Sequence, residues 1–224
     1  MSNEITTLIN SNFEQNQQIE IFLKNLNYSL NSENSNEKQV LLNYRKNLPE
    51  IPDEKYHANL PDDLVLAYYN NFTLLAYIHI SLHDESIGIE YIRTLDIYQN
   101  KGKCKLLLSV LVILSRLINP NINMIHMNST NNKLSYLSIF EFYAIPQDLY
   151  YKENLISKDD EKIYELKKEI AEMKDNSKEE KYKYIKSVET RFGKTLYIII
   201  DIYDLIIDNT YNLLNRYIQC SKYV

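Results

Sequence analysis

Residues 86–118 constrain the fold more than any other part of the chain. Residues 86–94 are rich in β-branched and aromatic side chains, which predicts a strand. A short polar turn follows at residues 99–104, and residues 104–118 are apolar on almost every side. This apolar run is long for a strand and has basic residues at its ends, so we expect a buried helix. The sequence therefore predicts a strand, a turn and a helix in succession.

The polar turn stands where that helix begins, and such a position suits a phosphate group. The first four N–H groups of a helix lack partners within it, and its end carries a positive charge of about half a unit. Phosphate binds such ends where small residues let the backbone come close. Of the three glycines in the chain, Gly102 lies in this turn, and the small residue Cys104 follows two positions later. The turn is a candidate phosphate site, and an ordinary strand-to-helix connection is the alternative.

The spacing Gln99-x-x-Gly102-x-Cys104 resembles the Q/R-x-x-G-x-G/A pyrophosphate loop of the GNAT superfamily of N-acetyltransferases. Tyr98, directly before the loop, is a common companion in that family. Cys104 departs from the pattern, because the family prefers Gly or Ala there, although its side chain is still small. The resemblance implies that the loop's amides hold the diphosphate of acetyl-coenzyme A. The cofactor-binding residues that it implies are Thr94, Gln99, Asn100, Lys101, Gly102, Lys103, Cys104 and Asn131.

Composition and charge exclude several other classes of protein. The 224 residues are 45% hydrophobic and 25% charged, which predicts one folded domain over residues 1–224. A net charge of −5 argues against a general grip on nucleic acid. The two cysteines, Cys104 and Cys220, form neither a disulfide framework nor a metal-ligand spacing. The most apolar run, residues 106–114, is shorter than the roughly 20 residues that span a bilayer. We therefore expect a cytoplasmic protein without a metal and with no nucleic-acid or membrane partner.

The pattern before the central stretch changes from helical to extended near residue 64. Apolar residues recur at spacings of three and four over residues 13–30, which predicts an amphipathic helix. We expect a second helix over residues 37–47 and a first strand over residues 5–9. Beyond the prolines that follow, three successive antiparallel strands are expected as a meander, over residues 64–69, 73–82 and 86–94.

After the central helix, the sequence predicts a strand over residues 122–127 and a helix over 133–143 that Asn131 and Asn132 cap. Residues 157–191 are densely charged, which favours a helical hairpin insertion with a solvated face. Strands are expected over residues 195–203 and 213–220, and a helix over 202–217 is the alternative for the second of these. The predicted fold class is α/β (α+β), a GNAT-like, mostly antiparallel mixed sheet flanked by helices. Its parts are an N-terminal helical part (1–60), a cofactor-binding core (64–145), the insertion, and C-terminal strands (195–220).

The resemblance also covers the helix predicted over residues 133–143, though less closely. The family pattern there is N-x-x-A-x-x-L-Y-E-K-x-G-F, and its tyrosine acts as general acid. In this chain Phe140 stands where that tyrosine would be, and Ala144 replaces the glycine. Tyr143 and Tyr136 lie on about the same helical face as Phe140, so they are the candidate acids. Ordinary packing is the alternative for both.

Acetyl transfer to an amine needs a group that removes the amine's proton, and Glu90 is the candidate base. In the predicted strand, Glu90 shares a face with Gly88, Ile92 and Thr94, and Thr94 matches the family position that bonds the acetyl and pantetheine end through its backbone. The alternative for Glu90 is a solvent-exposed strand carboxylate.

The loop adds three side chains of chemical interest. Lys101 and Lys103 are placed to neutralise the cofactor's phosphates, and the alternative for each is an ordinary solubilising lysine. Cys104 opens a helix, a position that lowers the pKa of a thiol, but no histidine partner supports a nucleophile there.

The sequence therefore predicts an N-acetyltransferase that moves an acetyl group from acetyl-coenzyme A to the amine of a small molecule or a protein. One alternative is a catalytically inactive GNAT-fold module that binds coenzyme A or a protein partner. Another is an unrelated α/β interaction protein whose turn matches the loop by coincidence. A homodimer is one option for its assembly.

Overall fold

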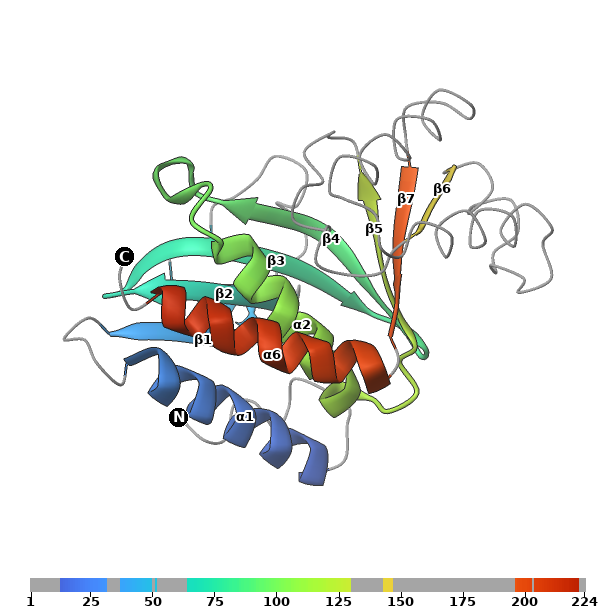
Figure 1. Cartoon of the computed structure of the whole chain (residues 1–224), viewed down its shortest axis with the longest axis horizontal. Coiled ribbons are helices and arrows are strands. Elements are labelled where there is room, and N and C mark those ends of the chain that lie inside the picture. The colour runs from blue at the N-terminus through green and yellow to red at the C-terminus, as the bar shows by residue number, and fades with distance from the viewer. Residues whose placement is uncertain are drawn as a thin grey trace. The chain divides into compact units, whose positions relative to one another are not determined.

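The computed structural model describes residues 13–31, 37–49, 51, 64–129, 143–146, 196–202 and 204–221 (Figure 1). The chain divides into two compact units, one formed by Met1–Asn123 with Tyr203–Val224 and the other by Met124–Ile202. The strand predicted at residues 5–9, the insertion at 157–191 and most of the helix at 133–143 lie outside the described residues. Among the described helices, none combines the length and apolar character needed to cross a membrane.

The strands of the first unit pair in chain order, each antiparallel to the next. They are β1 (Lys38–Tyr44), β2 (Leu64–Asn70), β3 (Thr73–Leu82) and β4 (Ser86–Thr94). Asn71 and Phe72 join β2 to β3 with φ angles of 48° and 65°, the left-handed values that suit a tight hairpin between twisted strands. The predicted meander is confirmed.

Strand β1 corrects the second predicted helix, which was expected over residues 37–47. Lys38, Val40 and Leu42 are buried and alternate with less buried neighbours, and the strand pairs with β2 from Lys38 opposite Asn70 onward. A short 3₁₀ turn, η2 (Arg45–Asn47), ends it. The apolar residues of this segment are adjacent in sequence and fit either period, so pairing with β2 decides the conformation.

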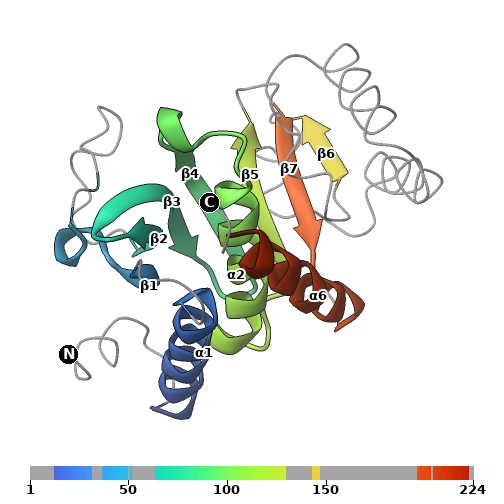
Figure 2. The same cartoon turned by 60° about the vertical axis from the view of Figure 1, so that its left-hand side comes forward.

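Helix α2 (Lys103–Ile118) forms the centre of the first unit, as its apolar sequence predicts. It contacts β2, β3 and β4, and it also contacts α1 (Phe13–Asn31) and α6 (Asp204–Ser221) (Figures 1 and 2). All its residues from 106 to 115 are buried, because neighbours cover it on more than one side. The opposite face of the sheet has its own buried cluster, made of Leu48, Val65, Ala67, Tyr69, Leu74 and Tyr77.

The outer edge of β1 is bonded to two asparagine side chains of α1. The Asn27 amide donates to the Val40 carbonyl at 3.1 Å, and its oxygen accepts from the Val40 N–H at 2.7 Å. The Asn31 amide pairs in the same way with the backbone of Lys38, at 2.7 Å in both directions. These side chains therefore supply the hydrogen bonds that a further strand would supply, and they protect an edge that would otherwise be open to pairing.

Helix α6 corrects the strand predicted over residues 213–220 and confirms the helical alternative. Its buried residues Ile206, Thr210, Leu214 and Ile218 recur every four positions, which is the spacing of one helical face. A strand over the same residues would also place all four on one face. A segment of 18 residues is long for a strand, however. Contact with α2 and α1 favours the helix.

The second unit contains an antiparallel sheet in which β7 (Leu196–Asp201) pairs with both β5 (Met124–Ser129) and β6 (Tyr143–Pro146). Strands β5 and β7 confirm the strands predicted near residues 122–127 and 195–203. Strand β6 is a correction, because Tyr143 was expected at the end of a helix. With these elements, the predicted α/β fold class with a mostly antiparallel sheet and flanking helices is confirmed.

Candidate functional site

The candidate phosphate site lies at the beginning of α2. Gly102 is the residue before the helix and has φ 74° and ψ 5°, a left-handed conformation that glycine adopts without steric cost. The N–H of Leu106 donates to the Gly102 carbonyl at 3.0 Å and closes the first turn. The N–H groups of Lys103, Cys104 and Lys105 precede any carbonyl that the helix can offer, and no side chain caps the helix. The helix thus leaves three backbone donors without a partner of its own.

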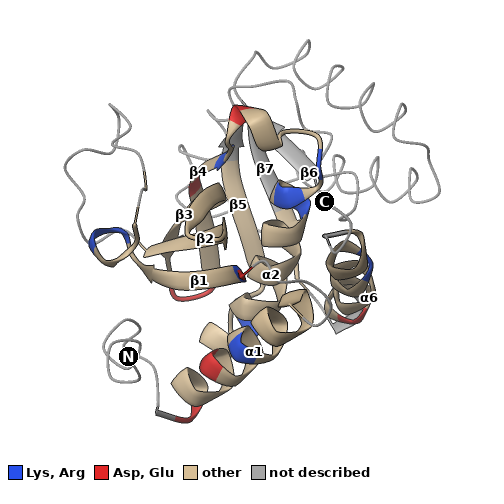
Figure 3. Ribbon diagram, turned by 90° about the vertical axis from the view of Figure 1, so that its left-hand side faces the viewer, with Lys and Arg blue, Asp and Glu red and all other residues tan. Residues whose placement is uncertain are grey.

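Charge around this helix start is positive. The first turn contains no acidic residue, and Figure 3 shows basic residues at the beginning of α2. A helix N-terminus carries positive charge of its own, so lysines are unfavourable there and an anion is favourable. The site's charge therefore fits a phosphate group.

The sequence suggests the same role for Lys101 and Lys103, but the fold places their side chains in different surroundings. Lys101 is exposed, with its Nζ 6.0 Å from the centre of the Tyr98 ring. Lys103 is only 5% exposed, and its Nζ lies 5.4 Å from the centre of the Tyr68 ring in β2. Burial lowers the pKa of Lys103, and the charges of Lys38 and Lys101 lower it further. Lys101 can thus meet a ligand with its side chain, whereas Lys103 offers its backbone N–H.

The remaining loop residues hold the turn in place. The Gln99 amide donates to Asp96 Oδ1 at 2.9 Å, across the 3₁₀ turn η3 (Asp96–Tyr98). Asn100 has φ 60°, a left-handed value that asparagine tolerates better than most residues. These features direct the chain from β4 into α2.

Cys104 is not an activated nucleophile. Burial raises the pKa of its thiol to about 12, and the charge of Lys105 offsets this only partly. A position at a helix N-terminus lowers the pKa of a thiol, but for Cys104 the loss of solvation outweighs that effect. At neutral pH the Cys104 thiol is protonated.

Glu90, the candidate base, lies at a β-bulge in β4. Tyr91 pairs with His79 and Ile89 pairs with Ile80. Glu90 is therefore an extra residue that lies opposite no residue of β3 in the strand pairing. Bulges bend a strand and redirect a side chain, and they are frequent beside active sites. The Glu90 side chain is exposed to solvent.

The bulge corrects the strand face predicted for Glu90. Ile89, Ile92 and Thr94 lie opposite alternate residues of β3 and therefore share one face. Because the extra residue interrupts the alternation, Ile89 takes the place on that face where the sequence put Glu90. The sequence contains no signal for a bulge at this position.

Sequence reasoning missed Ser81 and His83, which lie next to Glu90. The Ser81 hydroxyl donates to Glu90 Oε1 at 2.6 Å, and His83 Nε2 lies 3.3 Å from the same hydroxyl oxygen. The hydroxyl thus holds one oxygen of an exposed carboxylate. Only the register of the β3–β4 hairpin brings these residues together.

Tyr143 is in β6, opposite Ile199, and not on a helix. The prediction that it shares a helical face with Tyr136 is therefore wrong, because Tyr143 belongs to a strand. Tyr136 and Asn131 lie outside the described residues.

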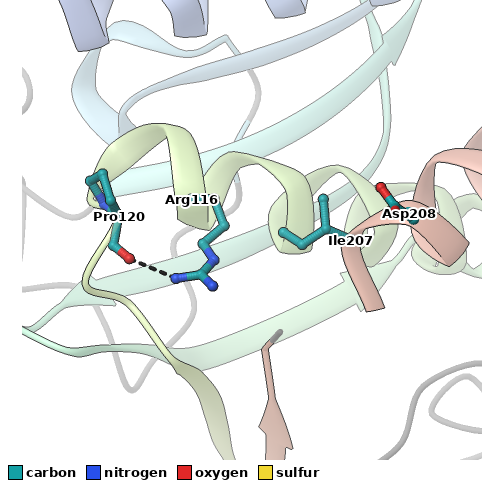
Figure 4. Close-up of a pocket in the computed structure, with 4 residues that line it drawn as sticks. All are labelled: Arg116, Pro120, Ile207 and Asp208. Atoms are coloured by element: carbon teal, nitrogen blue, oxygen red, sulfur yellow. Dashed lines mark hydrogen bonds between the residues drawn. The ribbon is translucent and has the colours of Figure 1, made fainter. Parts of the chain in front are cut away.

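A surface hollow of about 390 Å³ lies at the opposite end of α2, lined by Arg116, Pro120, Ile207 and Asp208 (Figure 4). The Arg116 guanidinium donates to the carbonyls of Pro120 at 2.6 Å and Ile122 at 3.3 Å. These bonds fix the chain that leaves the helix, so the arginine has a structural task there.

No protein-family model matches the sequence, and no curated protein matches it either. The structure is similar to several solved structures. N-acetylglutamate synthase from Neisseria gonorrhoeae, complexed with coenzyme A and N-acetyl-glutamate, is 11% identical with a TM-score of 0.40; the match covers 84% of this chain and 32% of that one. Tetrahymena GCN5 is 14% identical with a TM-score of 0.41, over 88% of this chain and 94% of that one. A GNAT family acetyltransferase from Elizabethkingia anophelis with acetyl-CoA bound is 12% identical with a TM-score of 0.42, over 73% and 97%.

Proposed function

We propose that this chain is an N-acetyltransferase that transfers the acetyl group of acetyl-coenzyme A to an amine. The observation that carries the proposal is the start of α2, where a left-handed Gly102 leads into an uncapped helix end without an acidic residue. Such an end favours a diphosphate, because it combines free N–H donors with positive charge. The loop spacing of the acetyltransferases supports the same assignment.

The residues at this helix start fit the diphosphate of coenzyme A. The N–H groups of Lys103, Cys104 and Lys105 are the donors that we assign to its oxygen atoms. Lys101, which is exposed, adds a mobile positive charge. Gln99 and Asn100 shape the loop, and we assign the backbone of Thr94 and the side chain of Asn131 to the rest of the cofactor. Bound acetyl-coenzyme A supplies an activated thioester.

Glu90 is the proposed base. An amine must lose a proton to attack a carbonyl carbon, and a carboxylate takes that proton directly or through a water molecule. The exposed Glu90 side chain is accessible to an amine, and Ser81 holds one of its oxygens at 2.6 Å. Tyr143 is our proposed acid for the departing thiolate, and Tyr136 is the alternative.

The acceptor that we propose is the amine of a small molecule or of a protein. Amines in water are mostly cationic, and the chain's net charge of −5 attracts cations over long range. This attraction raises the encounter rate and does not select one amine.

A second candidate function is a module that binds coenzyme A without transferring acetyl groups. The observation that favours it is the position of Tyr143 in a strand, away from the helical arrangement that a general acid was expected to have. This candidate shares the cofactor site of the first and differs in turnover.

A melting experiment tests the cofactor site. Acetyl-coenzyme A at about 100 times its Kd stabilises a protein by roughly 2.7 kcal/mol. That corresponds to a rise of roughly 5–10 °C for a chain of this size. Gly102→Glu puts a carboxylate at the diphosphate site and should abolish the rise. Gly102→Gln is the matched control, because it has the same backbone strain and nearly the same size without the charge.

The outcomes separate the readings. No rise with the wild-type chain would reject the proposal, and equal rises in both variants would reject this loop as the site. A rise that only Gly102→Glu abolishes, together with release of free coenzyme A in the presence of an amine panel, supports the transferase. Binding without release over the whole panel supports the module.

A further inference from the structure

Tyr217 of α6 brings an aromatic ring to the turn at which α2 begins. A Cβ atom on Gly102 would lie 3.7 Å from Cδ1 and 3.8 Å from Cε1 of the tyrosine. A side chain at position 102 would therefore meet the ring in ordinary van der Waals contact, and the glycine leaves that space beside the ring open. The two residues are far apart in sequence and meet because α6 packs against α2 (Figure 2).

Among the residues that the structure describes, the Tyr217 ring lacks the aromatic and cation–π contacts found for three other tyrosine rings of the first unit. Tyr98 and Tyr68 each have a lysine Nζ near the ring, and Tyr211 packs edge-on against Phe22 with centroids 6.4 Å apart. Within the described residues, the Tyr217 ring takes part in no ring pair and no cation–π contact. Its side chain is half-buried, and burial together with Cys220 raises the pKa of the phenol, so it is neutral at pH 7.

In coenzyme A the adenosine is attached covalently to the diphosphate, so it is within reach of a ring beside a diphosphate site. The diphosphate is bonded directly to the 5′ oxygen of the ribose, which carries the adenine. A diphosphate on the N–H groups of Lys103 and Cys104 therefore places the adenosine next to the helix start. Adenine has flat π faces that stack on aromatic side chains in a sequence-independent manner. A neutral ring with no other ring partner is suited to that contact.

We propose, resting on the proposed function, that Tyr217 is a specificity-determining residue of the cofactor site and that its ring stacks on the adenine of coenzyme A. The site then distinguishes the whole coenzyme from fragments that lack adenosine. It also joins the C-terminal helix to cofactor binding, since the loop supplies the phosphate donors and α6 supplies the aromatic wall.

The test uses titration calorimetry to compare wild type and variants for coenzyme A and for 4′-phosphopantetheine, which lacks the adenosine, its 3′-phosphate and one phosphate of the diphosphate. Tyr217→Leu keeps an apolar side chain and removes the aromatic ring. It should weaken coenzyme A binding about tenfold, within the range for loss of one base stack, and change 4′-phosphopantetheine binding by less than about twofold. Tyr217→Phe keeps the ring and should bind coenzyme A within about twofold of wild type.

Tyr211→Leu is the matched control, because it removes a tyrosine from the same helix at a position that faces Phe22 and not the loop. It should leave both Kd values unchanged. Equal or tighter coenzyme A binding by Tyr217→Leu would overturn the inference, and so would equal losses for both ligands, which indicate a general distortion of the loop. If the wild-type chain binds neither ligand, the proposed function itself fails and the inference falls with it.

Discussion

Replacing Asn27 by alanine should open the edge of the first unit's sheet and destabilise the protein. The wild-type side chain donates to the Val40 carbonyl at 3.1 Å and accepts from the Val40 N–H at 2.7 Å. Alanine removes both bonds, and each contributes a net of about 0.5–1.5 kcal/mol. The expected loss in the free energy of unfolding is therefore about 1–3 kcal/mol. Alanine also favours a helix by up to about 0.7 kcal/mol over asparagine, which reduces the observed loss.

Urea unfolding measures this loss, and Asn25→Ala is the matched control. Asn25 is exposed on the same helix, so its replacement reports the helix propensity alone. The difference between the two variants isolates the contribution of the bonds to β1. The slope of the unfolding free energy against urea should not change, because the same surface becomes exposed. A difference below about 0.5 kcal/mol would refute the argument that these bonds stabilise the edge.

Two further predictions concern the site. Glu90→Gln should lower kcat by about 100-fold or more and leave the Kd of acetyl-coenzyme A unchanged, because an amide cannot accept the amine's proton; an unchanged kcat in steady-state assays would remove Glu90 as the base. Cys104 should resist iodoacetamide at pH 8 while the exposed Cys220 reacts, because its pKa of about 12 keeps the thiol protonated. Peptide mass spectrometry checks this, and equal alkylation of both cysteines would contradict it.

The sequence predicts the central elements well because their signals are local. The strands of the meander are short runs rich in β-branched and aromatic residues, helix α2 is an apolar run too long for a strand, and flanking turn residues mark their ends. The segment of β1 has adjacent apolar residues that fit two periods, and only its pairing with β2 selects the strand. The sequence of helix α6 fits two conformations for the same reason.

The candidate site is harder to predict because it depends on register and on contacts between distant residues. One extra residue at Glu90 changes which side chains of β4 share a face, and nothing in the local sequence marks it. The contact of Ser81 with Glu90 follows from that register. Tyr217 reaches Gly102 only because two helices pack together.

The start of α2 violates several rules of local stability at once. Gly102 has a left-handed conformation, the helix has no capping side chain, and Lys103 places a cation in a buried position at the positive end of the helix. Glycine tolerates this conformation, but the missing cap and the buried lysine each cost stability in a chain without a ligand, and local rules are often broken at functional sites. A bound anion would offset the lack of a cap and the excess of positive charge together. The same features that weaken this helix start alone are those that make it suited to hold a diphosphate.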